Sequence, residues 1–303
     1  DMMQNPSSGQ SAVYLDILRG LEDSISDDQN LMIGTNFREF HSFGIQTRIR
    51  ATQQTQTLKN RLEFGVRLHG DDVLRVHTEN PHRMEQGALV ATDTTLTQLD
   101  SKANAYAIAA HIHNDLGVGP LRFVPGLRME SIRSRYQKKD EDENPWLQRT
   151  DFLPGFGMNA NLTGWADLFA GVHRGFSPVA PGQSPDVSAE TSWNYELGLR
   201  FYPGVQIELV GFVNDYTNLT GQCTLSAGCD ENDIGLQFNG GKALIFGAET
   251  ALNHTLYLPH AMSVPIQASY TYTNAQFKSD FNSNFSQFGR VKAGFWLPYV
   301  PRH

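Results

Sequence analysis

The chain has 303 residues, a net charge of -8 and a pI near 5.7, so it lacks the basic surface that nucleic-acid binding requires. It contains no apolar run approaching the roughly 20 residues of a membrane-spanning helix, which excludes a helical membrane protein. A membrane β-barrel stays open, because a lipid-facing strand needs only about 9 to 11 residues with every second one apolar. No break in composition marks a linker, and we interpret residues 1–303 as one domain.

The N-terminal part combines a polar segment with a first hairpin. Residues 1–37 are polar and turn-rich apart from an apolar patch with helical spacing at 14–21, and we expect mainly an outer loop with a helical turn or two. Apolar residues then alternate with polar ones at 43–51 and again at 62–69. This alternation predicts two strands joined by the short polar link at 53–57.

Four further hairpins show the same period of two. Pro203-Gly204 is a typical tight turn between the two strands of the clearest of them. The predicted strands are 106–113 and 121–130, 152–160 and 166–172, 192–201 and 205–216, and 244–252 and 264–273. A last segment at Leu297–His303 reads as the start of one more strand.

The connections between these strands alternate strictly between short and long. Short links lie near residues 54, 118, 162, 203 and 260, and long polar loops are predicted at 78–100, 138–147, 177–188, 218–241 and 279–297. Short turns at one rim and long loops at the other are typical of a bacterial outer-membrane barrel. A soluble Greek-key sandwich has no reason to sort its loops in this way.

The only two cysteines, Cys223 and Cys229, lie in the polar loop from Gly221 to Asp230. We predict that they form a disulfide in an oxidising compartment, which loop entropy would make worth roughly 2 kcal/mol. Two free thiols are the alternative. A metal site would need further ligands that this loop does not supply.

A set of short sequence strings resembles the barrel of TonB-dependent outer-membrane receptors, with the ferric-citrate type as the nearest branch. The strings, spread over residues 38–303, are FGVRLH from Phe64, VPGLRME from Val124, GVHRGFSP from Gly171, ETSWNYELGLR from Glu190, FNGG from Phe238, FGAE from Phe246 and LPYVPRH from Leu297. The resemblance implies a receptor for a ferric siderophore or ferric-citrate-like chelate, embedded in outer-membrane lipid and energised through TonB. It implies neither an enzyme nor a bound cofactor.

Such receptors hold an N-terminal plug domain inside a 22-stranded barrel. Ten complete strands are predicted here, so we expect an all-β antiparallel meander forming part of such a wide barrel, curved and not closed on itself. The plug, through which TonB acts, and the last strands are not recognisable in the sequence.

The polar side chains of the predicted strands would face the barrel lumen. The candidates are Arg48, Arg67, Arg122, Arg128, Arg200, Glu63, Glu130 and Glu196. Arginines there would attract an anionic ferric complex. The alternative is that they pair with Glu63, Glu130, Glu196 and Glu249 and hold the wall together.

Three other functions fit parts of the sequence. Asp71, Asp72 and His77 suggest a ten-stranded outer-membrane protease, and a passive porin is an alternative within transport. A metal site is the third possibility. Its candidate ligands are His41, His69, His77 and His82, or the pair His111 and His113 on one strand face. That pair has no third ligand nearby in sequence, and we predict no metal site.

On the membrane interpretation, the apolar face should remain exposed in the isolated chain because lipid is its solvent. The residues chosen to test this are Leu62, Phe64, Leu127, Leu197, Leu199, Ile266 and Tyr270.

Overall fold

The fold is known from a computed structural model that describes residues 9–139, 145–184, 186–202, 204–223, 236–282 and 289–303. Strands dominate, and the helices are α1 (Gly9–Leu18) and the short η1 (Asp27–Gln29). No helix among these residues has the length and apolar character needed to cross a membrane.

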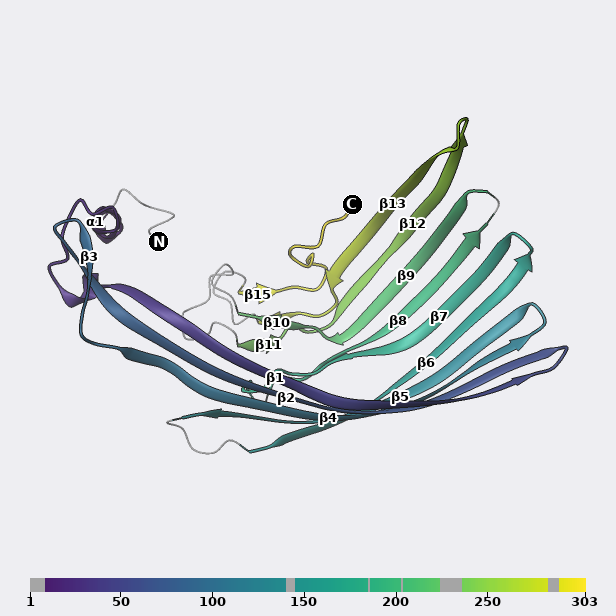
Figure 1. Cartoon of the computed structure of the whole chain (residues 1–303), viewed down its shortest axis with the longest axis horizontal. Coiled ribbons are helices and arrows are strands. Elements are labelled where there is room, and N and C mark those ends of the chain that lie inside the picture. The colour runs from purple at the N-terminus through teal and green to yellow at the C-terminus, as the bar shows by residue number, and fades with distance from the viewer. Residues whose placement is uncertain (1–8, 140–144, 185, 203, 224–235, 283–288) are drawn as a thin grey trace. The chain divides into compact units, whose positions relative to one another are not determined.

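The strands follow one another as an antiparallel meander (Figure 1). Their order in the sheet is β1-β2-β4-β5-β6-β7-β8-β9-β12-β13, and β3 (Ala88–Ala91) pairs with the end of β2. The bounds are β1 Leu31–Gln54, β2 Leu58–Glu85, β4 Leu96–Val118, β5 Leu121–Lys138, β6 Leu147–Thr163, β7 Ala166–Ser177, β8 Glu190–Phe201, β9 Gln206–Asn218, β12 Ala243–Leu258 and β13 Met262–Phe277. The predicted all-β meander is therefore confirmed, with β1 and β13 as the two ends of the order.

Two compact units divide the chain. The first comprises Asp1–Phe43, Gly70–Ala105 and Ser134–Leu147, and it holds α1, η1 and β3. Its small core includes Ile17, which is fully buried. The second unit comprises Gly44–His69, Tyr106–Arg133 and Gln148–His303, and it contains the residues on which the functional argument rests.

Strand lengths correct one expectation. Residues 78–100 were expected to be a long polar loop, yet β2 continues to Glu85, β3 occupies Ala88–Ala91 and β4 already begins at Leu96. The α1 helix begins before the apolar patch at 14–21 and overlaps its first half, and β1 begins at Leu31, within the segment expected to be mainly loop.

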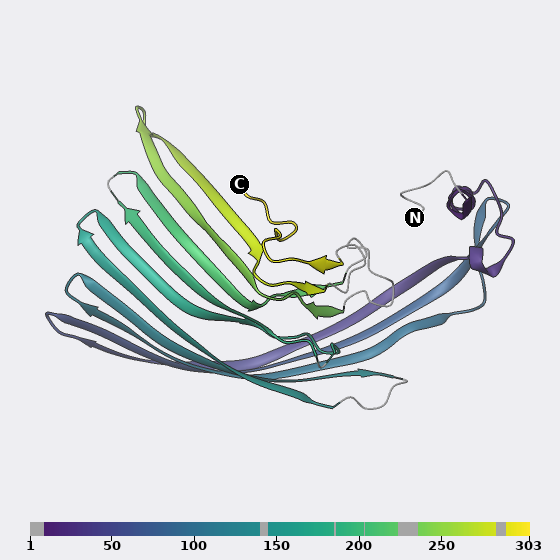
Figure 2. The ribbon, with the colours of Figure 1, turned by 180° about the vertical axis from the view of Figure 1, so that it is seen from behind.

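The short turns lie where the sequence placed them. The sheet reverses after Gln54, Val118, Thr163, Phe201 and Leu258. Within the second unit these turns lie together at one end of the strands, whereas the short strands β10 (Thr220–Gln222), β11 (Gln237–Asn239) and β15 (Arg290–Val291) lie at the other (Figures 1 and 2). Loop lengths in this unit are thus sorted by end, as they are in outer-membrane barrels.

Cross-strand register gives the sheet two chemically different faces. Leu168, Leu199 and Leu209 are register partners on β7, β8 and β9, whereas Arg200 on the opposite face is paired with Glu208. Of the seven apolar residues chosen as tests, all except the half-buried Leu199 are exposed. A contiguous apolar surface of this kind exceeds what a soluble monomer tolerates and is suited to lipid.

A C-terminal segment runs beside β13. Trp296 forms an isolated bridge with Gln276, and Leu297 donates its backbone N–H to the carbonyl oxygen of Ala275 at 3.0 Å. The side chain of Arg302 lies over the Trp296 ring, 3.7 Å from its centroid. The sequence suggested the start of a further strand at Leu297–His303, and the structure shows these residues beside β13 without forming a regular strand.

Candidate functional site on the polar face of the sheet

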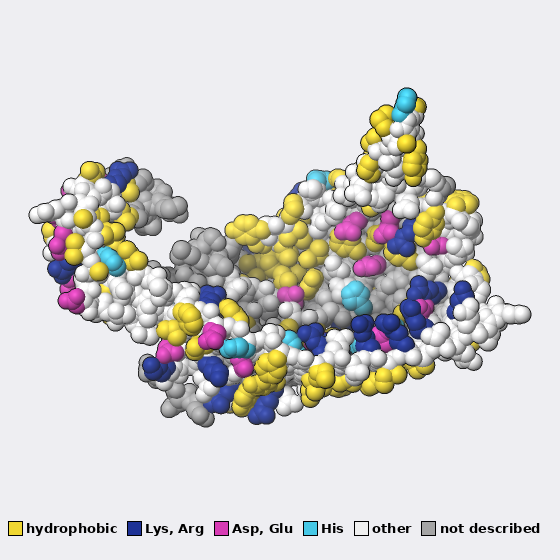
Figure 3. Space-filling model, viewed as in Figure 1, with side chains coloured by type: hydrophobic (Ala, Val, Ile, Leu, Met, Phe, Trp, Pro, Cys, Tyr) yellow, Lys and Arg dark blue, Asp and Glu magenta, His cyan; other side chains and the backbone are white. Residues whose placement is uncertain are grey.

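The polar face of the second unit carries charged side chains of both signs next to one another (Figure 3). Each comes from an alternate position of a strand whose other positions are apolar, because successive side chains of a strand point to opposite sides. The predicted lumen candidates on this face differ in the partners they meet.

Asp115 on β4 is the centre of a three-strand cluster. Arg122 on β5 donates to both of its carboxylate oxygens at 2.6 Å, and Arg61 on β2 donates to Oδ2 at 3.0 Å. The Asp115 side chain is 14% exposed, so its charge is largely removed from water and is compensated by two guanidinium groups. This cluster ties together three consecutive strands of the sheet.

Two other candidate arginines are paired with glutamates. Arg200 donates from Nε to Glu208 at 2.6 Å, and its guanidinium lies 5.0 Å from the centroid of the Phe169 ring. Arg128 donates to Glu130 at 2.7 Å along a single strand. Arg128 thus meets one of the glutamates named in the pairing alternative, although within β5 and not across strands, whereas the partner of Arg200, Glu208, was not among them.

Arg48 and Arg67 have a different status. Among the residues that the structure describes, Arg48 makes no ion pair, and Arg67 contacts Nδ1 of His69 at 3.2 Å but no carboxylate. Glu196 lines an open polar hollow of about 390 Å³ on β7, β8 and β9, together with His173, Ser192 and Asn214. These side chains remain available to a ligand or to another part of the protein.

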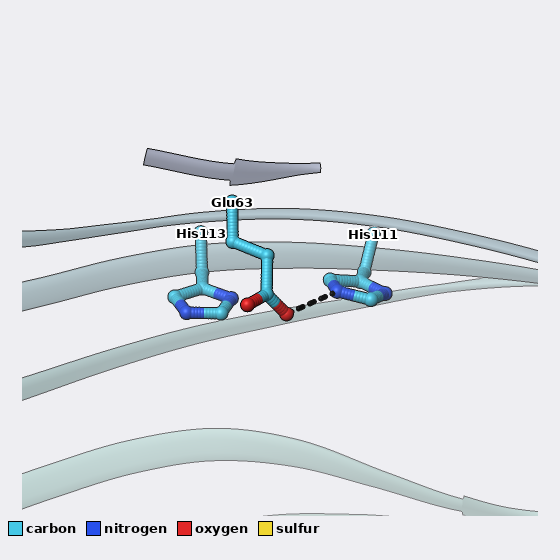
Figure 4. Close-up of side chains that lie close together, drawn as sticks. All are labelled: Glu63, His111 and His113. Atoms are coloured by element: carbon cyan, nitrogen blue, oxygen red, sulfur yellow. Dashed lines mark hydrogen bonds and ion pairs between the residues drawn. The ribbon is translucent and has the colours of Figure 1, made fainter. Parts of the chain in front are cut away.

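A third group was missed by the sequence analysis. The carboxylate of Glu63 on β2 lies between the rings of His111 and His113 on β4 (Figure 4). Arg50 donates from Nε to Glu63 Oε2, and His111 Nε2 is 3.2 Å from Oε1. A possible third ligand, absent from the local sequence around the histidine pair, thus comes from another strand, 48 residues before His111 in the chain.

The other histidine candidates do not gather in this way within the described residues. His41 and His77 each lie 3.5 Å from a single glutamate, and His82 contacts the carbonyl oxygen of Asn80. Asp72, a residue of the protease alternative, accepts a hydrogen bond from Asn104.

Only one of the two cysteines of the predicted disulfide lies among the residues that the structure describes. Cys223 is 4% exposed and disulfide-bonded, whereas Cys229 lies outside the described residues. Their pairing therefore stays a prediction.

Comparison with known proteins identifies the family of this chain. The family model described as TonB dependent receptor-like, beta-barrel matches residues 10–303. The chain belongs to this family. Its members are outer-membrane transport receptors and not enzymes, which confirms the resemblance and leaves the protease alternative without support.

Solved structures show the same fold. The unliganded ferric citrate transporter FecA is 21% identical with a TM-score of 0.68, and the match covers 90% of this chain and 40% of FecA. The siderophore receptor PiuA from Acinetobacter baumannii is 13% identical with a TM-score of 0.64, covering 88% of this chain and 43% of PiuA. The copper transporter OprC is 15% identical with a TM-score of 0.54, covering 78% and 38% respectively. The chain thus spans about 40% of the length of the first of these receptors.

Proposed function

We propose that this chain is the barrel wall of a receptor that imports a ferric chelate of the siderophore or citrate type, with energy supplied through TonB. The observation that carries the proposal is the family match over residues 10–303. Structural neighbours named as ferric citrate and siderophore receptors support the ligand class.

The polar face offers a physical reason for an anionic ligand. Three candidate arginines, Arg122, Arg128 and Arg200, are neutralised by neighbouring carboxylates. Arg48 and Arg67 are not, so their charges are available to a chelate whose carboxylate or catecholate groups carry negative charge. We propose these two arginines as contacts along the path of the chelate.

The test uses the full-length receptor in cells that lack their own ferric-citrate and siderophore receptors. Uptake of radioactive iron is measured with ferric citrate and with a ferric siderophore, in the presence and absence of TonB. A TonB-dependent uptake of either chelate supports the proposal. Uptake that persists without TonB would indicate the passive porin.

A control variant that removes the same charge elsewhere distinguishes a specific role of the two arginines from a general effect of losing positive charge. Arg48→Gln and Arg67→Gln should lower the rate of uptake, whereas Arg174→Gln should not. Arg174 is the register partner of Trp193 and shares its face of the sheet, away from Arg200. Equal rates in all three variants would exclude Arg48 and Arg67 from the path.

One of the similar solved structures suggests a second possible cargo, copper. Because OprC is named a copper transporter, uptake of copper is measured in parallel with iron. Copper uptake without chelate uptake would replace the proposed ligand while leaving the receptor class unchanged.

A further inference from the structure

Glu63, His111 and His113 form a compact group on the polar face of the second unit. One potential ligand atom from each residue lies within 4.8 Å of the others. We propose that these three side chains bind a divalent first-row transition ion, independently of the chelate that the receptor transports. The ion would join β2 to β4, from which the three ligands come.

The donor set fits such an ion. Two imidazoles and one carboxylate bind zinc, and the same combination holds iron(II) in other proteins. Zinc ligands lie about 2.0 to 2.2 Å from the metal, so roughly tetrahedral ligand atoms are about 3.3 Å apart. Small side-chain rotations of the two nearly parallel rings, whose centroids are 6.0 Å apart, would bring the three atoms to that spacing.

Two glycines lie against the two histidines. A Cβ added to Gly65 would collide with the ring of His111, and one added to Gly126 would lie 3.2 Å from Cβ of His113. Any other residue at 65 would therefore force the His111 ring to shift. The site is therefore shaped by backbone on two neighbouring strands as well as by its own ligands.

The competing interpretation is a simple ion pair. Arg50 occupies Oε2 of Glu63, and His111 contacts Oε1, so the carboxylate is satisfied without a metal. A metal ion needs only Oε1, and it would replace the contact between His111 and Glu63. Arg50 would then fix the orientation of the carboxylate, as hydrogen-bond partners of metal ligands commonly do.

His113 distinguishes the two interpretations. In the part of the chain that the structure describes, its ring is nearly parallel to that of His111, with the centroids 6.0 Å apart, and it makes no hydrogen bond to Glu63. An ion pair of Arg50 with Glu63 does not need His113, whereas the metal site loses one of its three ligands when His113 is replaced.

The experiment measures Co²⁺ binding to the folded, untagged full-length receptor in detergent. Tetrahedral Co²⁺ absorbs in the visible range, and displacement by Zn²⁺ then reports the affinity for zinc. His113→Asn is compared with His173→Asn, which removes a polar-face histidine of β7 outside the group. Heat-modifiable migration on gels checks that each variant keeps its folded barrel wall.

We expect one Co²⁺ per chain, displaced by Zn²⁺. His113→Asn should weaken binding by at least the roughly 10- to 100-fold that follows loss of a hydrogen-bond partner around a metal. His173→Asn should bind as the unmodified chain does. Absence of a visible Co²⁺ band, unchanged binding in His113→Asn, or equal weakening in both variants would overturn the proposal.

Discussion

The cluster around Asp115 allows a quantitative test of how the polar face contributes to stability. Replacing Asp115 by Asn and Arg122 by Gln, singly and together, isolates the energy of their interaction in a double-mutant cycle. Arg122 donates two hydrogen bonds of 2.6 Å to Asp115, whose side chain is 14% exposed, although the Arg122 side chain itself is 54% exposed. Charged hydrogen bonds contribute about 1.5 to 3 kcal/mol and exposed ion pairs about 0.2 to 1 kcal/mol. Because one partner is buried and the other is not, we expect a coupling of about 1 to 2 kcal/mol.

The assay is urea unfolding of the folded protein in lipid vesicles, followed by tryptophan fluorescence. The pair Lys278 and Asp215 serves as the control, because its Nζ–Oδ1 distance is 2.8 Å but the side chains are 39% and 44% exposed. Its coupling should stay below about 1 kcal/mol. A coupling at Asp115 and Arg122 no larger than that of the control pair would refute the argument that burial of the carboxylate strengthens the cluster.

Two further predictions concern close packing and pH. Gly198→Ala should destabilise the sheet by about 1 to 3 kcal/mol, because its Cβ would lie 2.8 Å from the carbonyl oxygen of the facing strand and collide with an aromatic ring. Gly171→Ala, whose Cβ meets nothing within 4 Å, should be neutral in the same unfolding assay. The N–H of Ala293 and the guanidinium of Arg290 hold the pKa of Asp280 below its usual 3.8. The contacts of the ionised carboxylate therefore contribute their full stabilisation above pH 3.8, and this contribution is lost as the pH falls through the lowered pKa. Amide protection at Ala293 should show this acid step in the unmodified protein and lack it in Asp280→Asn.

The alternation of side chains predicted the strands wherever one face had to be apolar. Residues 192–201 are predicted as a strand and lie within β8 (Glu190–Phe201), because each apolar residue there faces the lipid side and each polar one the other. The same rule failed for 78–100. Beyond Gly70 the strand enters the first unit, where polar residues such as Glu79 and Asn80 continue the backbone pairing without an apolar face. Pairing of backbone groups requires no particular side chain, so periodicity could not reveal it.

An ion pair could be predicted only where a short turn sets the register between the two strands that carry it. Arg200 and Glu208 are eight residues apart across a short turn, so the hairpin itself places them opposite each other. Arg61 and Asp115 are 54 residues apart, and the strand β3 lies between them in the chain. Since the length of that connection leaves the register of β2 against β4 open, the sequence names the charged residues but not their partners.

The histidine pair shows how much depends on that register. His111 and His113 alternate along β4 and are visible in the sequence, but their carboxylate comes from β2. A shift of β2 by two residues keeps every side chain on its own face and would still satisfy the hydrophobic pattern. Such a shift would place Arg61 or Gly65 where Glu63 now lies, and neither can bind a cation. The proposed metal site therefore depends on one of several registers that are compatible with the apolar face. For this reason it could be recognised only in the structure, where the pairing of β2 with β4 is known.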